Sequence, residues 1–485
     1  MQRKFITSLA FLIFANLLVK PFWLFGIDRT VQNIVGPEEY GVYFAVFNLA
    51  FLFHIILDFG INNFNNRAVS RTPSRLEEYF SRVLQLKILL ALLYLFVIFL
   101  ISNIIDYSII LKKLLLLVAV NQILLSFILY FRSNIAALQN FRTDALFSIY
   151  DRLLMIILCG LVIWFNILDR TIDIFLFVYI QTISLAVAAV SGMIINLFYG
   201  KISFYAIDKD FILKIISKSY PFALLGILMS VYSRIDAVMI ERFLPDTGRT
   251  EAGIYAASYR ILDAANMLPF LFATILLPLY SRMIKEKKSV LKISRLAFGL
   301  VLAISITLST SSWLFNVQIM ELLYPDADVY WADVFGIVIA AFVPVSIMYV
   351  FGSLLTANGN LKALNTIAAT GVVINIMLNI ILIKKYGALG AAYATLATEW
   401  LVAIWHIFAA KKYLNIPVPA LTILKVLLLI AFIVIGGNLL IKTGLQWWLV
   451  YGLLMIFMFG CAASLKIFHP GEIYRAYNAE VTDAK

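Results

Sequence analysis

Long apolar stretches alternate with short polar connections along the whole chain, and this pattern predicts membrane-spanning helices. A helix needs about 20 apolar residues to cross the hydrocarbon core of a bilayer. No connection is long enough for a soluble domain, so the pattern predicts an all-α polytopic membrane protein. The fourteen expected spans are residues 5–26, 40–61, 83–103, 113–138, 147–168, 172–198, 217–244, 252–280, 292–317, 332–356, 363–383, 388–410, 421–441 and 446–467.

Composition supports this reading and excludes several others. Hydrophobic residues make up 63% of the chain and charged residues only 14%, whereas soluble domains have roughly 45–50% and about 25%. The net charge of +12 is spread thinly between apolar stretches, so we expect no nucleic-acid partner. The only cysteines, Cys159 and Cys461, lie within expected spans, which excludes a disulfide framework and a zinc-type cysteine cluster. The apolar run from Phe5 is not followed by a small-residue cleavage site, which favours an uncleaved first span over a signal peptide.

The distribution of Lys and Arg predicts the orientation of the chain. With the N-terminus inside the cell, 27 of the 39 basic residues fall on the cytoplasmic side, 9 fall on the outer side and 3 lie within spans. Cytoplasmic loops carry such an excess of positive charge. The bias therefore predicts that both termini are cytoplasmic and that the number of spans is even.

A weak internal repeat predicts the organisation of the helices. The segment 36–43, which opens the second expected span, resembles the segment 249–255, which opens the eighth, and Gly41 aligns with Gly253 at an offset of 212 residues. We therefore expect an N-lobe of six helices (1–205), a C-lobe of six helices (206–414), and two further helices with a cytoplasmic tail (415–485). Parallel repeats of this kind enclose a central binding site in transporters.

Ionisable side chains within the expected spans are the first candidates for function. Each costs roughly 2.5–3.5 kcal/mol at the bilayer centre, so such residues face the protein interior or a wet cavity. The charged members are Lys20, Asp58, Arg234, Asp236, Glu241, Arg260, Asp263 and Glu399, accompanied by His54 and His406.

Lys20 and Arg234 are the strongest candidates for substrate binding. They lie 214 residues apart, close to the repeat offset, and neither has an obvious partner nearby in the sequence. Each lobe would then offer one cation at a similar depth in its first helix. Two such cations across a cleft suit an anionic headgroup such as a pyrophosphate.

The other charges have both structural and functional readings. Arg260 and Asp263 are spaced to pair on one helical face. His54 and Asp58, and likewise Glu399 and His406, share a face and form either a packing contact or a proton or sodium coupling site.

Proline positions predict irregular helices. Pro21 should kink or open the first span beside Lys20. Pro269 and Pro278 should interrupt the eighth span, and Pro344 the tenth. Four asparagines at 62, 63, 65 and 66 should cap the end of the second span.

Sequence signals for catalysis are weak. No phosphate-binding loop is present, which disfavours ATP-driven transport by this chain alone, and no pattern indicates a metal or another cofactor. The pair Asp326-Ala-Asp328 resembles the Asp-x-Asp of glycosyltransferases, but it lies in a short loop with no catalytic domain around it. We therefore expect a protein that is not an enzyme.

Several short motifs, in this order and spacing, resemble the polysaccharide transporter (O-antigen flippase) family. That family belongs to the superfamily that also holds multidrug exporters and lipid II flippases, and the resemblance covers essentially the whole chain. The motifs are Asn16, Lys20 and an Asp28-Arg29 turn, then residues 36–43, Leu57-Asp58-Phe59-Gly60, Arg234-Ile235-Asp236, residues 252–255, and residues 386–392.

The resemblance implies a flippase in the bacterial inner membrane, working by alternating access of two lobes. Its cargo would be an undecaprenyl-pyrophosphate-linked oligosaccharide, a precursor of O-antigen lipopolysaccharide, capsule or exopolysaccharide. A glycan polymerase or ligase would be a downstream partner, and membrane lipid would surround the protein. Fourteen helices agree with lipid flippases, because multidrug members typically stop at twelve.

The resemblance also bears on the candidate residues. Basic residues in the first, second and eighth helices matter in lipid II flippases, and Lys20 and Arg260 are the nearest counterparts here. The second span carries Asp58 instead of a cation, which argues against lipid II as cargo. Asp58, Asp263, Glu399 and His54 are the candidates for ion coupling. A multidrug or cation exporter, and a membrane glycosyltransferase or ligase, stay as alternatives.

Overall fold

The computed structural model describes residues 15–16, 18–71, 76–138, 140–200, 209–417, 420–465 and 467. Every regular element among these residues is a helix, and they contain no strand. The prediction of an all-α protein is therefore confirmed. Residues 5–14 of the first expected span and the expected tail beyond residue 467 lie outside the described residues.

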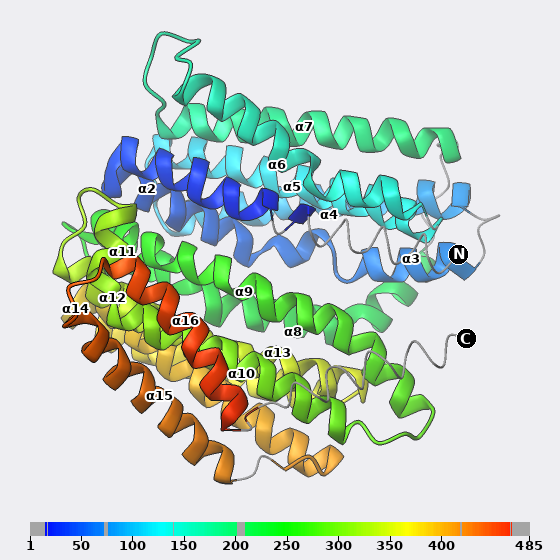
Figure 1. Cartoon of the computed structure of the whole chain (residues 1–485). Coiled ribbons are helices and arrows are strands. Elements are labelled where there is room, and N and C mark those ends of the chain that lie inside the picture. Colours follow the sequence, from blue (N-terminus) through cyan, green and yellow to red (C-terminus); the bar gives the residue numbers. More distant parts are fainter. Residues whose placement is uncertain are drawn as a thin grey trace. The chain divides into compact units, whose positions relative to one another are not determined.

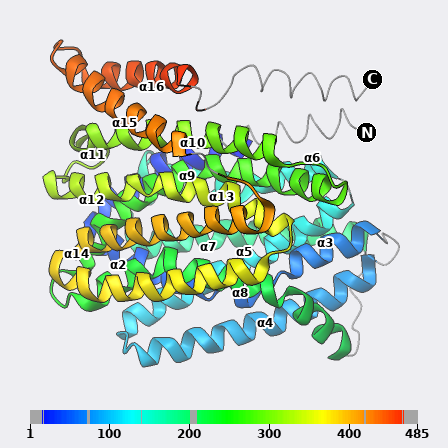
Figure 2. The same ribbon diagram turned by 90° about the horizontal axis from the view of Figure 1, so that it is seen from below.

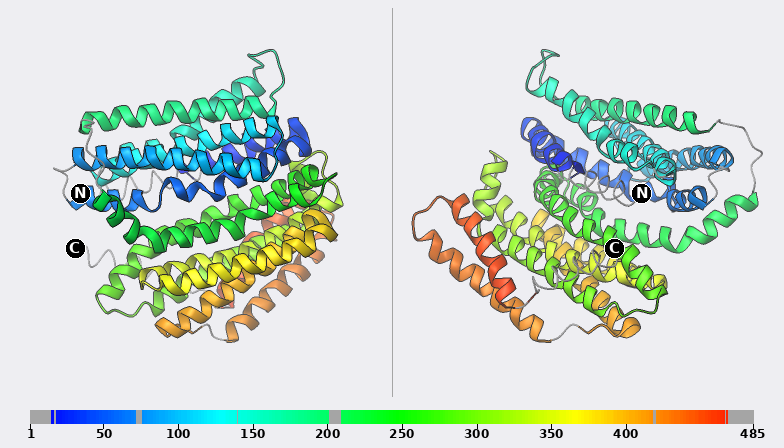
Figure 3. Two further views of the ribbon diagram at one scale, coloured as in Figure 1. Left: turned by 180° about the vertical axis from the view of Figure 1, so that it is seen from behind. Right: turned by 45° about the vertical axis from the view of Figure 1, so that its right-hand side comes forward.

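Packing divides the chain into two compact units, Met1–Gly253 (unit 1) and Ile254–Lys485 (unit 2). The six-helix lobes 1–205 and 206–414 of the sequence repeat stay a prediction. Within unit 1, α5, α6 and α7 lie side by side in the views of Figures 1 and 3. The elements of unit 1 are the π-helix η1 (Trp23–Asp28), α2 (Arg29–Leu52), the 3-10 helix η2 (His54–Leu57), α3 (Ile61–Arg71), α4 (Leu76–Ile104), α5 (Ile109–Ala137), α6 (Phe141–Ile163), α7 (Ile174–Tyr199), α8 (Lys209–Phe243) and the first residues of α9 (Gly248–Lys285).

The helix that carries Lys20 departs from α geometry where proline was expected to disturb it. Directly after Pro21, residues Trp23–Asp28 adopt the wider π-helix. Asp28 itself has helical dihedral angles (φ −59°, ψ −46°), so the predicted Asp28-Arg29 turn is wrong. The interruption comes at Gly36, whose φ of 82° favours glycine. Pro37 then starts the next helical stretch with its φ already fixed.

The second expected span, 40–61, is not one continuous helix. α2 ends at Leu52, the short η2 follows, and α3 begins at Ile61. Phe59 and Gly60 between them have φ values of 42° and 76°. The apolar pattern alone predicted an unbroken span, because it carries no information on the side chains that bind the freed backbone groups at the break.

Prolines affect the later helices unequally. α9 runs through Pro269 and Pro278 without an interruption, so the expected break there is wrong; neighbouring groups in membrane bundles often satisfy the backbone that proline frees. The break near Pro344 is confirmed. There α12 ends at Ala340 and α13 begins at Phe342, two residues before the proline.

The expected spans 363–383 and 388–410 lie in one assigned helix, α14 (Leu361–Leu414), divided by a sharp kink. The kink is Gly387, with φ 59° and ψ −134°. Eleven of the described helices are long and apolar enough to cross a membrane, and α14 supplies two expected spans. The chain is thus a multi-pass membrane protein, and the count of fourteen stays a prediction.

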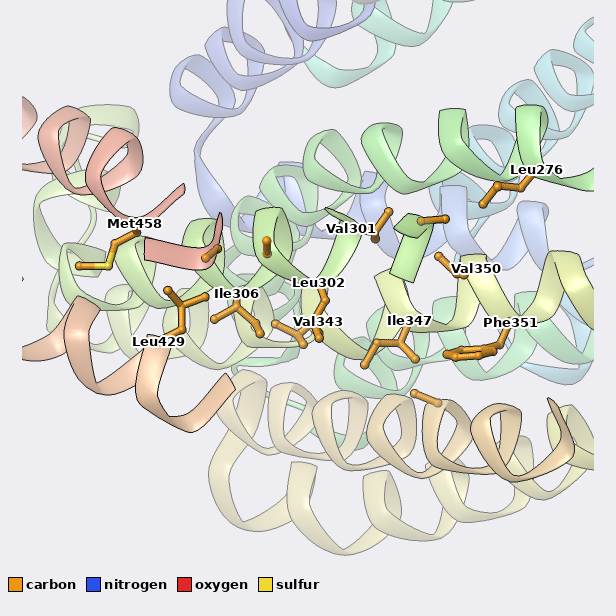
Figure 4. Close-up of a cluster of buried hydrophobic side chains, with 14 of the residues drawn as sticks. Leu276, Val301, Leu302, Ile306, Val343, Ile347, Val350, Phe351, Leu429 and Met458 are labelled. Atoms are coloured by element: carbon orange, nitrogen blue, oxygen red, sulfur yellow. The ribbon is translucent and has the colours of Figure 1, made fainter. Parts of the chain in front are cut away.

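Unit 2 is built around a continuous apolar core (Figure 4). Val301, Leu302 and Ile306 of α10 pack with residues of α13 such as Ile347 and Phe351. The remaining elements of unit 2 are α10 (Leu291–Leu314), α11 (Asn316–Leu323), α12 (Val329–Ala340), α13 (Phe342–Ala357), α14, α15 (Ala420–Ile441) and α16 (Trp447–Ser464).

The last two helices belong to this core. α15 and α16 form a hairpin, seen in Figure 2, and both pack on α10. Leu429 of α15 and Met458 of α16 are fully buried beside Ile306 (Figure 4). A hydrogen bond of 3.0 Å joins Tyr451 of α16 to Ser312 of α10. The two extra helices are therefore an integral layer of unit 2.

Candidate functional site

Lys20 lies in a group of charges inside unit 1. Its half-buried ammonium interacts electrostatically with Arg132 at the end of α5 and with Arg152 and Asp151 of α6. Arg132 is paired with Asp144 at 2.9 Å, and Arg152 with Asp151 at 3.6 Å. We call these five residues (Lys20, Arg132, Asp144, Asp151 and Arg152) the Lys20 cluster.

The Lys20 cluster has more positive than negative charge. Three cations face two carboxylates, and both carboxylates are engaged by the arginines. Among the described residues, no carboxylate forms an ion pair with Lys20. An uncompensated ammonium in a largely apolar bundle is costly, so an anion brought to this cluster would be stabilised.

Aromatic side chains fix the geometry of the cluster. The guanidinium of Arg152 lies 5.5 Å from the ring centroid of Trp23, the first residue of η1. Trp23 in turn stacks on Phe177 of α7 at 5.9 Å. The π-helix after Pro21 thus brings Trp23 against the arginine, and the sequence order Lys-Pro-Phe-Trp has a local structural consequence.

A second polar centre lies at the break between α2 and α3, around η2. Asp58 forms an ion pair of 3.5 Å with Lys87 of α4, and its Oδ1 accepts a hydrogen bond from the backbone N–H of Asn62 at the start of α3. His54 stacks on Phe51 at 5.8 Å. His54 also interacts electrostatically with Lys87 and Asp58, so the two residues predicted to share a helical face belong to one polar centre.

Arg234 lies over an aromatic row in unit 1. Its guanidinium is 5.6 Å from the ring centroid of Phe51 on α2, and Phe51 stacks on both His54 and Phe47. Arg234 is half-buried on α8. The structure thus connects Arg234 with His54 through one ring, and places Lys20 in a separate cluster of the same unit.

The remaining candidates lie in unit 2. Arg260 and Asp263 are half-buried on α9, and Glu399 is buried on α14. His406, one of the buried residues of α14, hydrogen-bonds through Nδ1 to the carbonyl oxygen of Val402 at 2.8 Å. Tyr255 of α9 contacts Thr395 of α14 at 2.9 Å, so these two helices share a polar contact inside unit 2.

One member of the Asp-x-Asp pair, Asp328, has a structural role. Asp328 caps α12, and its carboxylate accepts the backbone N–H of Trp331 at 3.1 Å. This is the ordinary task of an aspartate at a helix N-terminus. Asp326 is exposed in the preceding loop.

Sequence reasoning missed the charges that organise both centres of unit 1. Lys87, Arg132 and Arg152 were counted with the cytoplasmic loops, although their positions fall inside the expected spans 83–103, 113–138 and 147–168. Lys87 is 2% exposed. A strict count of charges within the expected boundaries would have found all three.

The sequence matches the family described as "Polysaccharide biosynthesis protein" over residues 9–284, more than half of the chain. No curated protein shows significant sequence similarity to it. Among solved structures, the fold is similar to that of a lipid II flippase, MurJ, in an inward closed conformation, with a TM-score of 0.70 and 17% identity over 95% of this chain and 97% of the other.

Transporters of related fold also match. An inward-facing multidrug resistance MATE family transporter of the MOP superfamily gives a TM-score of 0.65 and 14% identity over 81% of this chain and 94% of the other. A MOP superfamily transporter from Pyrococcus furiosus, described as having a binding pocket of reverse polarity, gives 0.61 and 13% identity over 84% and 95%. At these identities the likeness concerns the fold.

Proposed function

This chain belongs to the polysaccharide biosynthesis protein family, and we propose that it is a flippase for a polyprenyl-pyrophosphate-linked oligosaccharide. The cargo would be an undecaprenyl-linked repeat unit of O-antigen, capsule or exopolysaccharide. It would move from the cytoplasmic to the outer leaflet of the bacterial inner membrane by alternating access. Family membership supports the link to polysaccharide, and the fold shared with a lipid II flippase supports a lipid-linked cargo.

The Lys20 cluster is the observation that carries this proposal. A pyrophosphate is the charged part of such a lipid, and it needs cations that are not already neutralised. Lys20 fits because neighbouring carboxylates are held by Arg132 and Arg152. Arg132 and Arg152 would thus serve to occupy the carboxylates, which leaves the charge of Lys20 for the phosphate.

Arg234 and Arg260 would bind the headgroup at other stages of the movement. Arg234 lies over the ring of Phe51, and this contact holds its guanidinium group in place. Ion coupling through Asp58, Asp263, Glu399 or His54 is proposed as the energy source, with proton or sodium as the ion. Consumption of the product by a polymerase or ligase would serve the same purpose.

The test is deletion of the gene in its host, followed by measurement of lipid-linked intermediates and surface glycan. Complementation would use wild type, Lys20→Ala, Lys20→Arg and Arg234→Ala. We expect lipid-linked units to accumulate inside after deletion, and Lys20→Ala to restore less than a tenth of the surface glycan. Lys20→Arg should restore most of it, because the charge is kept.

Lys113→Ala is the matched control. Lys113 is an exposed lysine of α5 that lies over the ring of Phe175, so its loss should leave transport unchanged. Membrane levels of every variant are measured in parallel. Unchanged lipid-linked pools and surface glycan after deletion would contradict the proposed cargo.

A multidrug or cation exporter is the second candidate, supported by the MATE-like fold. It predicts altered tolerance to cationic drugs with normal surface glycan. A membrane glycosyltransferase or ligase is less well supported, because Asp328 already caps α12. That reading requires both Asp326 and Asp328 for activity while Lys20 is dispensable.

A further inference from the structure

The break between η2 and α3 places backbone and side-chain oxygens around one buried ammonium group. Lys87 comes from α4, and its side chain is only 1% exposed. Its Nζ lies 2.7 Å from Ser126 Oγ, 3.1 Å from the Leu57 carbonyl oxygen, 3.3 Å from the Ser126 carbonyl oxygen and 3.5 Å from Asp58 Oδ1. Residues of α4 and α5 and the end of η2 all contribute to this centre.

The arrangement differs from an ordinary buried ion pair. The carboxylate of Asp58 is the most distant of the four oxygens, and the nearer three are a hydroxyl and two backbone carbonyls. An ammonium group has three hydrogens to donate. Four oxygens surround the nitrogen, so three N–H groups cannot give each oxygen its own hydrogen bond. A spherical ion could coordinate all four.

The oxygens also match the chemistry of a hard cation. Carboxylate, hydroxyl and carbonyl oxygens are the donors that hard metal ions prefer, and no nitrogen or sulfur belongs to the set. Leu57 ends η2, so its carbonyl lies at the start of the irregular segment between η2 and α3. Unwound carbonyls at broken membrane helices coordinate sodium in other transporter folds.

We propose that these four oxygens form a site for a monovalent cation of the size of sodium, and that Lys87 occupies it with its own ammonium group. The lysine then acts as a resident cation. It neutralises Asp58 and holds the end of η2 against α4 and α5. The wild-type protein therefore binds no free sodium at this place while Lys87 occupies it.

Removal of the lysine side chain should expose the site to free ions. Lys87→Ala leaves the oxygens in place, leaves Asp58 without its ion-pair partner, and opens the space of a propylammonium group. Sodium in solution should enter and restore the stability of the fold. Lys87→Ser creates nearly the same space and adds one oxygen, so it should respond in the same way.

The experiment compares thermal unfolding of the purified full-length protein in sodium chloride and in choline chloride at equal ionic strength. Each variant is also extracted and purified separately in both salts. We expect Lys87→Ala and Lys87→Ser to melt several degrees higher in sodium than in choline. The wild-type difference is subtracted, because it reports any sodium site elsewhere in the chain. Equilibrium binding of radioactive sodium should then show one ion per protein more than in wild type.

Two further variants test the assignment of the oxygens. Lys87→Ala with Asp58→Asn keeps the space but removes the negative charge, and should lose the gain in sodium response. Lys113→Ala, which removes an exposed lysine, should behave as wild type.

The proposal is overturned if neither small variant at position 87 responds to sodium more than wild type does. It is also overturned if these variants fail to accumulate in both salts, because a filled site should support the fold. A response that persists after Asp58→Asn would place the ion elsewhere. None of these measurements uses a lipid-linked substrate, so their outcome is independent of the proposed cargo.

Discussion

Two glycines that align in the sequence repeat lie directly against each other's helices within unit 1. A Cβ on Gly41 would collide with the carbonyl oxygen of Arg249, and one on Gly253 would collide with that of Pro37. Both neighbours are backbone atoms, which a rotamer change cannot move. Gln32 adds a hydrogen bond of 3.0 Å to the carbonyl of Gly253.

We therefore expect Gly41→Ala and Gly253→Ala to destabilise the protein, each by about 1–3 kcal/mol, as overpacked sites do. The measurement is the melting temperature of the purified protein, together with its level in the membrane. The physical reason is that α2 and the start of α9 pack too closely for a methyl group. Larger residues at either position should therefore destabilise the protein more.

Gly452→Ala and Gly460→Ala are the matched controls for this prediction. Both glycines lie within α16, and a Cβ on either would meet no atom within 4 Å. Alanine there should be neutral or stabilising by about 1 kcal/mol, because it lowers the entropy cost of helix formation. Equal melting temperatures for all four variants would show that the crossing tolerates a methyl group.

The residue scale also shows why sequence could identify candidates without finding their partners. Lys20 and Arg234 stood out because a cation in an apolar span is expensive. Arg152 and Lys87 are equally expensive, yet their role depends on contacts with Trp23 and Ser126, residues distant in sequence. Apolar periodicity carries no information on such pairings.

At the scale of elements, α12 offers a prediction that separates a helix cap from a catalytic motif. Asp328→Ala removes the acceptor for the Trp331 N–H, and such a loss costs about 1 kcal/mol. Thermal melting should show the decrease, while glycan transport in complemented cells stays normal. Asp326→Ala should change neither.

Asp328→Asn is the informative variant for this pair. Asparagine caps helices about as well as aspartate, so stability should return to the wild-type value although the carboxylate is gone. If Asp328→Asn abolished the production of surface glycan at normal membrane levels, the carboxylate would have a chemical role, and the ligase reading would regain support.

Element boundaries followed the sequence wherever hydrophobicity alone decides them. The expected spans 292–317 and 421–441 correspond closely to α10 and α15. The prediction of an unbroken second span was wrong because Lys87 and Ser126 bind the freed Leu57 carbonyl and compensate the break. The continuous α9 is the reverse case, since prolines signal a break that the tertiary structure does not have.

At the scale of the whole molecule, the repeat leaves matching contacts in the two units. Tyr43 and Tyr255 differ by the repeat offset of 212. Each forms a hydrogen bond to a helix far along the chain, Tyr43 with Gln181 of α7 and Tyr255 with Thr395 of α14. The partners differ by 214 residues. These two contacts agree with the predicted repeat, and the repeat itself stays a prediction.

The direction of flipping depends on the orientation of the whole chain, which the distribution of Lys and Arg predicts. Thr171, between α6 and α7, is expected outside the cell, and Ser289, between α9 and α10, is expected in the cytoplasm. Both side chains are exposed. Each would be changed to cysteine in a background where Cys159 and Cys461 are replaced by alanine.

A membrane-impermeant maleimide applied to intact cells should label Thr171→Cys strongly and Ser289→Cys only after permeabilisation. This labelling pattern would place both termini in the cytoplasm. The proposed cargo, which is made in the cytoplasm, would then enter the protein from that side. The opposite labelling would leave the fold and the family intact but reverse the orientation. A flippase for a precursor made in the cytoplasm would then have to bind its cargo at the face that we predict to be extracellular. The excess of Lys and Arg on the other face would need another explanation.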